Sequence, residues 1–195
     1  MASSNVSQFL QTIGQGVKPN MFLIDIQFPQ PISLESEDQK LTNILCKSAA
    51  LPGSNLGVIE VPFRGRTVKI AGDRTFDTWT TTFFNDKDFK LRAFFEQWAN
   101  SINTHEGNTA PLFTPNNSDG YMADLGVKQL EKDASEEGAL LRSYTLKYCF
   151  PTNVSSIDLA YDSNDQIEEF TVEWQYSYFT AEGGTRAGVS DVGVV

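Results

Sequence analysis

The chain has 195 residues, with 15 Lys and Arg residues against 25 Asp and Glu residues, so that its formal net charge is −10. This acidic balance argues against a general nucleic-acid-binding protein, because such proteins gain most of their affinity from basic side chains that contact phosphates. The length suits one domain, and 40% hydrophobic residues supply enough apolar surface for a core, which excludes a disordered chain.

The start of the chain does not resemble a targeting segment. The first fifteen residues lack the basic start and apolar run of a secretory signal, and no apolar stretch reaches the roughly 20 residues that span a bilayer. We therefore expect a cytoplasmic protein with no membrane-spanning segment. In a reducing compartment Cys46 and Cys149 are expected to be buried free thiols.

The N-terminal part predicts a short helix and two strands. A helix is expected at about residues 4–14, ended by Gly14 and Gly16, because its apolar residues recur at helical spacing. Those residues are Val6, Phe9, Leu10 and Ile13. Alternating apolar residues predict a strand over residues 21–28, and the apolar stretch 41–51 predicts another.

Residues 58–71 predict a hairpin or a long two-stranded ribbon. Two β-prone runs, 58–63 and 67–71, flank the turn Arg64-Gly65-Arg66. A further strand is expected over residues 77–84, which are rich in Thr, Trp and Phe.

Residues 87–102 predict the one long helix. Leu91, Phe95 and Trp98 recur at spacings of three and four, and Asn85 or Asp86 can cap the first amide groups. A long surface loop without periodicity follows at about residues 103–120.

The second half returns to strands, predicted over residues 121–132, 140–150, 156–161 and 166–180. In the last of these, aromatic and aliphatic residues alternate with a polar face. That polar face consists of Glu169, Thr171, Glu173 and Gln175. Residues 1–180 are therefore read as a single, mainly β domain with one packed helix, and the Gly-rich residues 181–195 as a flexible tail.

No motif of an enzyme, cofactor site or metal site is present in the sequence. His105 lies in a loop without a matching nucleophile motif. The run from Asp162 to Gln166 begins like a calcium loop, but Ile167 stands where the sharp turn requires Gly, so we interpret the run as a turn. We expect no catalytic residues, no cofactor and no metal.

One basic patch stands out in the acidic chain. It comprises Arg64, Arg66, Lys69 and Arg74. The patch suits a phosphate or an acidic neighbouring subunit equally well. The residues alone thus indicate a structural or interaction protein by elimination.

Several segments, in two parts of the chain, resemble a known family. Residues 46–53 read CKSAALPG, residues 71–80 read AGDRTFDTWT, and residues 151–154 read PTNV, followed by IEEFTV at 167–172. Together with Asn85-Asp86 and the helix after it, these segments resemble the tail tube proteins of T-even-like contractile-tailed bacteriophages. The resemblance covers about residues 17–180.

The resemblance implies a two-sheet β-sandwich or barrel with one flanking helix. Family members assemble as hexameric rings that stack into the hollow inner tube of a contractile tail, through which the genome is delivered. The implied partners are further copies of the chain, the tail sheath protein, baseplate and tape-measure proteins, and DNA in transit. The implied location is the virion tail, assembled in the host cytoplasm, and the charge of −10 suits a channel that must not retain DNA.

The resemblance also implies three candidate surfaces. The ring-stacking candidates are Arg64, Arg66 and Arg74, on the hairpin. The candidates for the lumen, or for a sheet face covered on assembly, are Glu169, Thr171, Glu173 and Gln175. The candidates for a sheath-facing helix are Lys87, Lys90, Arg92 and Glu96.

Two other functions remain open from the sequence. A baseplate or tube-initiator protein, or the tube of a related contractile injection system, shares the expected fold. A carbohydrate-binding β-sandwich would use Trp79, Trp98 or Trp174, although core packing explains a Trp on an apolar face equally well.

Overall fold

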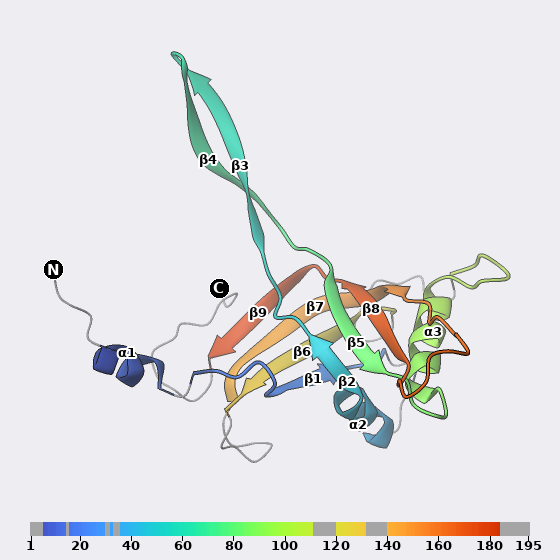
Figure 1. The fold of residues 1–195 in the computed structure, drawn as a ribbon. Coiled ribbons are helices and arrows are strands. Elements are labelled where there is room, and N and C mark those ends of the chain that lie inside the picture. The colour runs from blue at the N-terminus through green and yellow to red at the C-terminus, as the bar shows by residue number, and fades with distance from the viewer. Residues whose placement is uncertain are drawn as a thin grey trace.

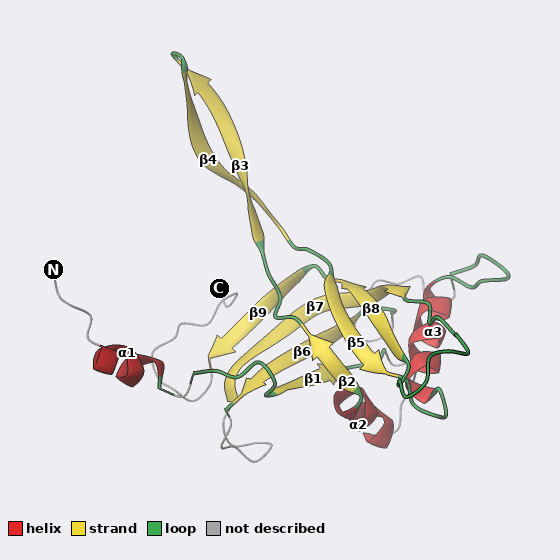
Figure 2. Ribbon diagram, viewed as in Figure 1, coloured by secondary structure: helices red, strands yellow, loops and turns green. Residues whose placement is uncertain are grey.

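The protein is built mainly of antiparallel strands, which confirms the predicted class (Figures 1 and 2). The computed structural model describes residues 6–14, 16–29, 32, 36–110, 120–131 and 140–183. The helices are α1 (Val6–Ile13), α2 (Ser36–Ile44) and α3 (Lys90–Ile102). The strands are β1 (Phe22–Ile26), β2 (Cys46–Ala49), β3 (Asn55–Phe63), β4 (Arg66–Thr75), β5 (Trp79–Phe84), β6 (Ala123–Leu130), β7 (Leu140–Val154), β8 (Glu169–Gln175) and β9 (Tyr178–Gly183).

The long strand β7 joins two sheets. Its N-terminal part pairs with β6 and β9, and β6 pairs in turn with β1. Its C-terminal part pairs with β8, which leads through β5 to β2. All these pairings are antiparallel. The strands β1-β6-β7-β9 and β7-β8-β5-β2 thus form two sheet walls, which share the strand β7.

The core lies between these walls and is rich in aromatic residues. Ile24, Leu125 and Val127 enter it from the first wall, because alternate residues of a strand point to the same face. Phe170 and Trp174 enter it from β8. Burial of side chains of this size is the main stabilising contribution in a domain of this length.

Helix α3 packs against this core, as its spacing predicts. Leu91, Phe95 and Trp98 are fully buried, and the Phe95 ring contacts the rings of Phe83 and Trp174. The helix begins three residues later than expected. The side chain of Asp86 accepts hydrogen bonds from the amides of Lys90 and Leu91 (3.2 and 3.4 Å), which satisfies the exposed amides at the helix start.

The prediction of a strand over residues 41–51 is wrong in its first part. Residues Ser36–Ile44 form α2, and only Cys46–Ala49 form a strand. Leu41, Thr42 and Leu45 face inward at helical spacing, and Asn43 accepts a hydrogen bond from the amide of Ile24 on β1. Tertiary packing against β1 thus overrides the apolar run.

Two predictions in the C-terminal part also need correction. Residues 156–161 form a loop rather than a strand, with Leu159 and Tyr161 exposed. The predicted strand over 166–180 is two strands, because the ladder breaks at Tyr176 and Ser177. Tyr178 therefore leaves the buried face predicted for it and is exposed on β9.

The turn at residues 162–166, the three Trp residues and the free thiols of the two Cys residues agree with the sequence analysis. Asp165 takes a positive φ of 59°, the left-handed conformation that Asp tolerates in turns. Trp79, Trp98 and Trp174 are buried, which leaves no aromatic platform for a sugar on those residues. Cys46 and Cys149 are free thiols, the second fully buried.

Parts of the predicted organisation lie outside the described residues. Residues 103–110 follow α3 as a loop, whereas residues 111–119 and most of the predicted tail, residues 184–195, are not described. The part of the tail that is described continues β9 as far as Gly183. Among the described residues no helix has the length and apolarity needed to cross a bilayer.

Candidate assembly surfaces

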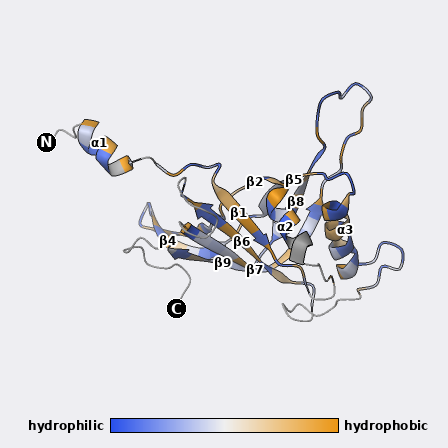
Figure 3. Ribbon diagram, turned by 90° about the horizontal axis from the view of Figure 1, so that it is seen from below, coloured by the Kyte–Doolittle hydropathy of each residue, from blue (hydrophilic) through white to orange (hydrophobic). Residues whose placement is uncertain are grey.

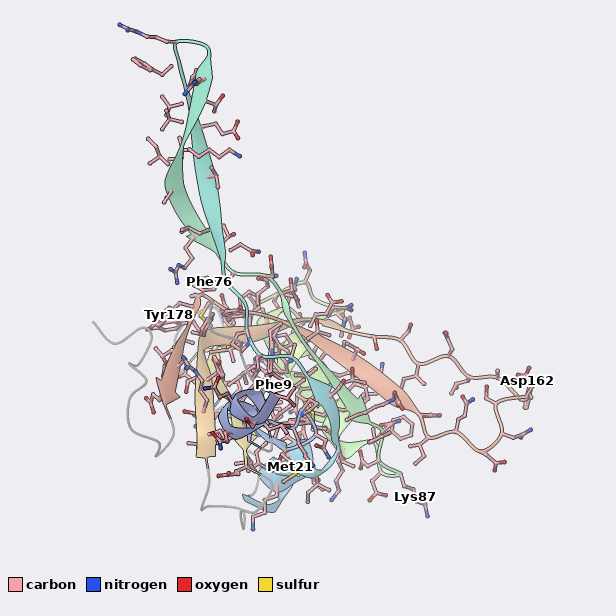
Figure 4. All side chains as sticks on the ribbon, turned by 60° about the vertical axis from the view of Figure 1, so that its left-hand side comes forward. Phe9, Met21, Phe76, Lys87, Asp162 and Tyr178 are labelled. Atoms are coloured by element: carbon pink, nitrogen blue, oxygen red, sulfur yellow. The ribbon has the colours of Figure 1, made fainter. Side chains whose placement is uncertain are left out.

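Strands β3 and β4 form a ribbon that stands away from the body of the protein (Figure 1). The turn at its tip places Arg64 and Gly65 at positive φ, 48° and 81°, which matches the twist of a tight hairpin. Every β3 residue is exposed, and side chains project from the ribbon along its length (Figure 4). The predicted hairpin is confirmed, and it is longer than expected.

One face of this ribbon is apolar. The pairs Ile59–Ile70 and Val61–Val68 lie directly opposite each other, and residues opposite each other in an antiparallel pair share a face. We call this the ribbon apolar face; it consists of Ile59, Val61, Phe63, Val68 and Ile70, which are between 41% and 62% exposed. An exposed apolar surface of this kind marks a contact with another molecule.

The ribbon is also basic, unlike the rest of the chain. Residues 55–75 contain four basic and two acidic residues, a net charge of +2, whereas the whole chain carries −10. The guanidinium of Arg64 lies 5.3 Å from the ring centre of Phe63, and Lys69 is 3.6 Å from Glu60. The candidates Arg64, Arg66 and Arg74 therefore lie on a positive arm of an otherwise acidic protein.

The foot of the ribbon is fixed to the body by aromatic and polar contacts. The ring of Phe76, which lies where the ribbon meets the body (Figure 4), has its centre 5.6 and 5.7 Å from the ring centres of Tyr176 and Phe179. The hydroxyl of Tyr176 donates a hydrogen bond to the carbonyl of Gly53 at 3.2 Å. The pKa of Tyr176 is raised, mainly by burial and to a smaller extent by the negative charge of Asp77. The direction in which the ribbon leaves the body is thus held at its base.

The polar face of β8 continues across its paired neighbour β5. Glu169 forms an ion pair with Lys47 at 2.5 Å, and the Gln175 side chain donates to Thr78 at 2.8 Å. Thr171 faces Thr82 at 3.4 Å. The four predicted residues share one face and are half-buried, with several of their side chains bonded within the chain.

A second polar face, which the sequence analysis missed, covers the solvent side of β1-β6-β7-β9. Pairing places Thr145, Lys147 and Thr180 on this face, opposite the core. Its other charged members are Asp25, Asp124, Lys128 and Glu182. Buried and less buried residues alternate along residues 123–130, and this pattern could have indicated a polar face on β6. Only the strand pairing shows that four strands share that face.

This sheet also has two open edges. Within the described residues, β1 pairs only with β6, and β9 pairs only with β7. An unpaired edge presents free amide and carbonyl groups to another strand.

Helix α3 presents its charged residues unequally. Lys90, the first residue of α3, is exposed, whereas Lys87 lies in the turn before the helix rather than on it and points outward (Figure 4). The side chain of Arg92 is only 17% exposed, because it donates to the carbonyl of Ser155 and pairs with Glu96 while its guanidinium covers Phe170.

Comparison with known proteins decides the family. The model of the phage tail tube protein family matches residues 17–182. The chain belongs to the phage tail tube protein family. It is 32% identical to tail tube protein gp19 of Enterobacteria phage T4 over 166 residues, which cover 85% of this chain and 92% of that protein.

Other relatives agree with this assignment. The tail tube protein of Serratia phage KSP90 is 27% identical over 177 residues, covering 90% of this chain and 95% of that protein. The fold is similar to a chain of an extracellular contractile injection system sheath-tube complex, with a TM-score of 0.60, 16% identity and coverage of 93% and 99%. This phage tail tube protein is thus a structural component of a virus tail.

The described residues of this tail tube protein show no arrangement typical of catalysis or metal binding. They contain no group of three or more His, Cys, Asp or Glu residues placed to hold a metal ion. The amide of His105 donates to the side chain of Asn100 at 3.1 Å. A hollow of about 960 Å³ lies within the loop at residues 156–169 and is lined by that loop itself.

Proposed function

We propose that this tail tube protein stacks as hexameric rings into a hollow tube, and that the ribbon formed by β3 and β4 makes the contact between copies. The exposed ribbon apolar face carries this proposal, because a monomer leaves that face in water. The opposite charges of the ribbon and the remaining chain favour another copy as the partner.

Arg64, Arg66 and Arg74 are the ring-stacking residues in this proposal. The test compares the concentration at which the full chain forms tubes with that of the double variant Arg64→Glu and Arg66→Glu, by sedimentation and negative-stain electron microscopy. Reversal should raise that concentration about tenfold or more, because like charges would then meet. Fully exposed tip residues should leave the subunit stability unchanged.

The matched control reverses two exposed basic residues elsewhere, Lys87→Glu and Lys90→Glu, and should polymerise normally. If the purified protein forms no tubes at any concentration, the same comparison is made with tubes nucleated on tail baseplates. Tubes of the arginine variant at the unchanged concentration would rule out the stacking role.

The open-edged sheet β1-β6-β7-β9 is proposed to line the channel. Its free edges, β1 and β9, can pair with neighbouring copies around a ring, which removes the exposed edges. Its solvent face carries hydroxyls and a slight excess of acidic groups, which do not retain a polyanion. Of the two roles predicted for Glu169, Thr171, Glu173 and Gln175, we propose the covered sheet face.

The remaining partners follow from the same arrangement. The exposed side of α3 with Lys90 and Glu96, together with Lys87 in the turn before the helix, is proposed to face the tail sheath, and Arg92 anchors the helix through Ser155. Baseplate and tape-measure proteins are proposed to contact the ends and interior of the tube, and assembly in the host cytoplasm precedes passage of DNA.

A baseplate-proximal tube protein is the alternative. A chain of the anti-feeding prophage baseplate has a similar fold, with a TM-score of 0.58 and 14% identity. The higher identity to tail tube proteins along 85% of the chain favours the tube.

A further inference from the structure

A second exposed apolar surface lies on helix α1. Its apolar residues recur at i, i+3, i+4 and i+7, which places them in one stripe. We call this stripe the α1 apolar face; it consists of Val6, Phe9, Leu10 and Ile13, which are between 49% and 71% exposed. Figure 3 shows α1 set apart from the sheets.

Such a helix needs a partner. An isolated helix of eight residues is unstable in water, because nucleation costs more than so few hydrogen bonds return. The sequence of α1 contains no charged residue, so salt bridges do not stabilise it either. Its partner should therefore be an uncharged apolar surface of similar length.

The ribbon apolar face has these properties. From Ile59 to Phe63 the strand advances about 13 Å at ~3.3 Å per residue. The eight residues of α1 span about 12 Å at ~1.5 Å per residue. Four aliphatic side chains and one aromatic side chain face outward over that length, with a basic residue, Arg66, only at the tip.

Within one chain the two faces do not meet. The ribbon and α1 leave the body in different directions (Figure 1). A contact between them therefore joins different copies.

We propose that α1 of one copy packs its apolar face on the ribbon apolar face of a second copy. The proposal rests on the proposed function, in which the ribbon contacts another copy, and it names the segment that covers the ribbon. In stacked rings the contact is heterologous, because a copy places its helix on one neighbour and receives the helix of a different neighbour on its ribbon, so it repeats along the assembly.

Cross-linking tests the pairing directly. The double variant Leu10→Cys with Val61→Cys is assembled into tubes, or taken from tail particles that carry it, and treated with a short thiol-reactive cross-linker. We expect a ladder of dimers and larger products on a denaturing gel. The native Cys46 and Cys149 are poor competitors, because burial raises the pKa of both thiols to about 12.

Two matched controls move one cysteine to the opposite face. Gln11→Cys with Val61→Cys uses the polar side of α1, and Leu10→Cys with Lys69→Cys uses the other ribbon face. Neither should give the ladder. A cross-link within one chain, or a ladder no stronger than in the controls, would overturn the proposal.

Assembly measurements separate this inference from the proposed function. The double variant Phe9→Ser and Ile13→Ser should raise the concentration needed for tubes about tenfold or more, whereas Gln11→Ser should not. The ribbon variant Val61→Ser and Ile70→Ser should have a similar effect.

If only the ribbon variant weakens assembly, the ribbon contact stands and the role of α1 is wrong. If neither does, the ribbon contact itself is wrong. The melting temperature of the unassembled subunit should stay unchanged in all these serine variants, because both apolar faces are exposed before assembly.

Discussion

Tyr148 has a backbone conformation that side chains rarely adopt, with φ at 59°, and Asp124 stabilises it. The pairing of β6 with β7 shifts here, so Asp124 faces both Lys147 and Tyr148. Its carboxylate accepts from the Lys147 ammonium at 2.6 Å and from the Tyr148 amide at 3.4 Å. One carboxylate thereby satisfies the amide that the bulge leaves out of the ladder.

Replacement of Asp124 by Ala should therefore destabilise the subunit. We expect a loss of about 1–3 kcal/mol in the free energy of unfolding, because a charged hydrogen bond and a bulge amide lose their acceptor. Denaturant unfolding measures it, with Asp25→Ala, an exposed position on the same face, as the control. An equal effect of both variants would contradict the role given to the bulge.

Cys149 makes stability depend on pH in the alkaline range. Burial raises the pKa of its thiol from 9.0 to about 12, so between these values the unfolded chain loses a proton that the folded chain keeps. The stability is therefore full below pH 9.0 and falls as the pH rises toward 12. In Cys149→Ala the melting temperature should fall less steeply over this range. Leu146→Ala, which also opens the core but keeps the thiol, should retain the steep fall.

At the scale of elements, the ribbon depends on two glycines. A Cβ on Gly72 would lie 3.2 Å from the backbone of Gly57 and from the side chain of Ile59. The strands thus approach most closely near the ribbon base, where their register shifts between Leu56 and Val58. The ribbon shares no buried residue with the core, so its shape can change without unfolding the body.

A Gly72→Val substitution should consequently impair assembly more than folding. We expect tube formation to require about tenfold more protein, while the free energy of unfolding stays within about 0.5 kcal/mol. Gly53→Val, at a position where an added Cβ meets nothing within 4 Å, is the control. Normal tubes of Gly72→Val would show that the ribbon shape is not needed.

At the scale of the whole molecule, charge is divided between surfaces. A basic arm projects from an acidic body, and the face with two open edges carries hydroxyls together with a slight excess of acidic over basic groups. This distribution favours contact between copies at the ribbon and weak contact with DNA at the sheet.

The channel assignment predicts different effects for two similar charge reversals. Glu182→Lys, on the sheet with open edges, should slow DNA release from particles, because a ring of added ammonium groups binds phosphates. Glu173→Lys, on the β8 face, should release DNA at the normal rate. Slow release by Glu173→Lys alone would place the β8 face in the channel.

Local sequence patterns determined several parts of the fold. The turn at Arg64-Gly65 and the buried stripe of α3 follow from short-range conformational preference and helical spacing. The alternation over Glu169–Gln175 separates a buried from a polar face for the same reason. The motifs at residues 46–53, 71–80 and 151–154, taken together with their neighbours, indicated the family, which the comparisons confirm.

Other features depended on contacts between distant segments. Helix α2 replaces a predicted strand because Asn43 and its neighbours meet β1, and Tyr178 changes face because β8 and β9 pair with different parts of β7. Within a single element such as α3 or β8, the sequence by itself determined which side chains share a face, since that depends on the local period alone. Only the tertiary structure decided which faces stay uncovered, because burial depends on long-range pairing; here these are the ribbon, α1 and the open-edged sheet.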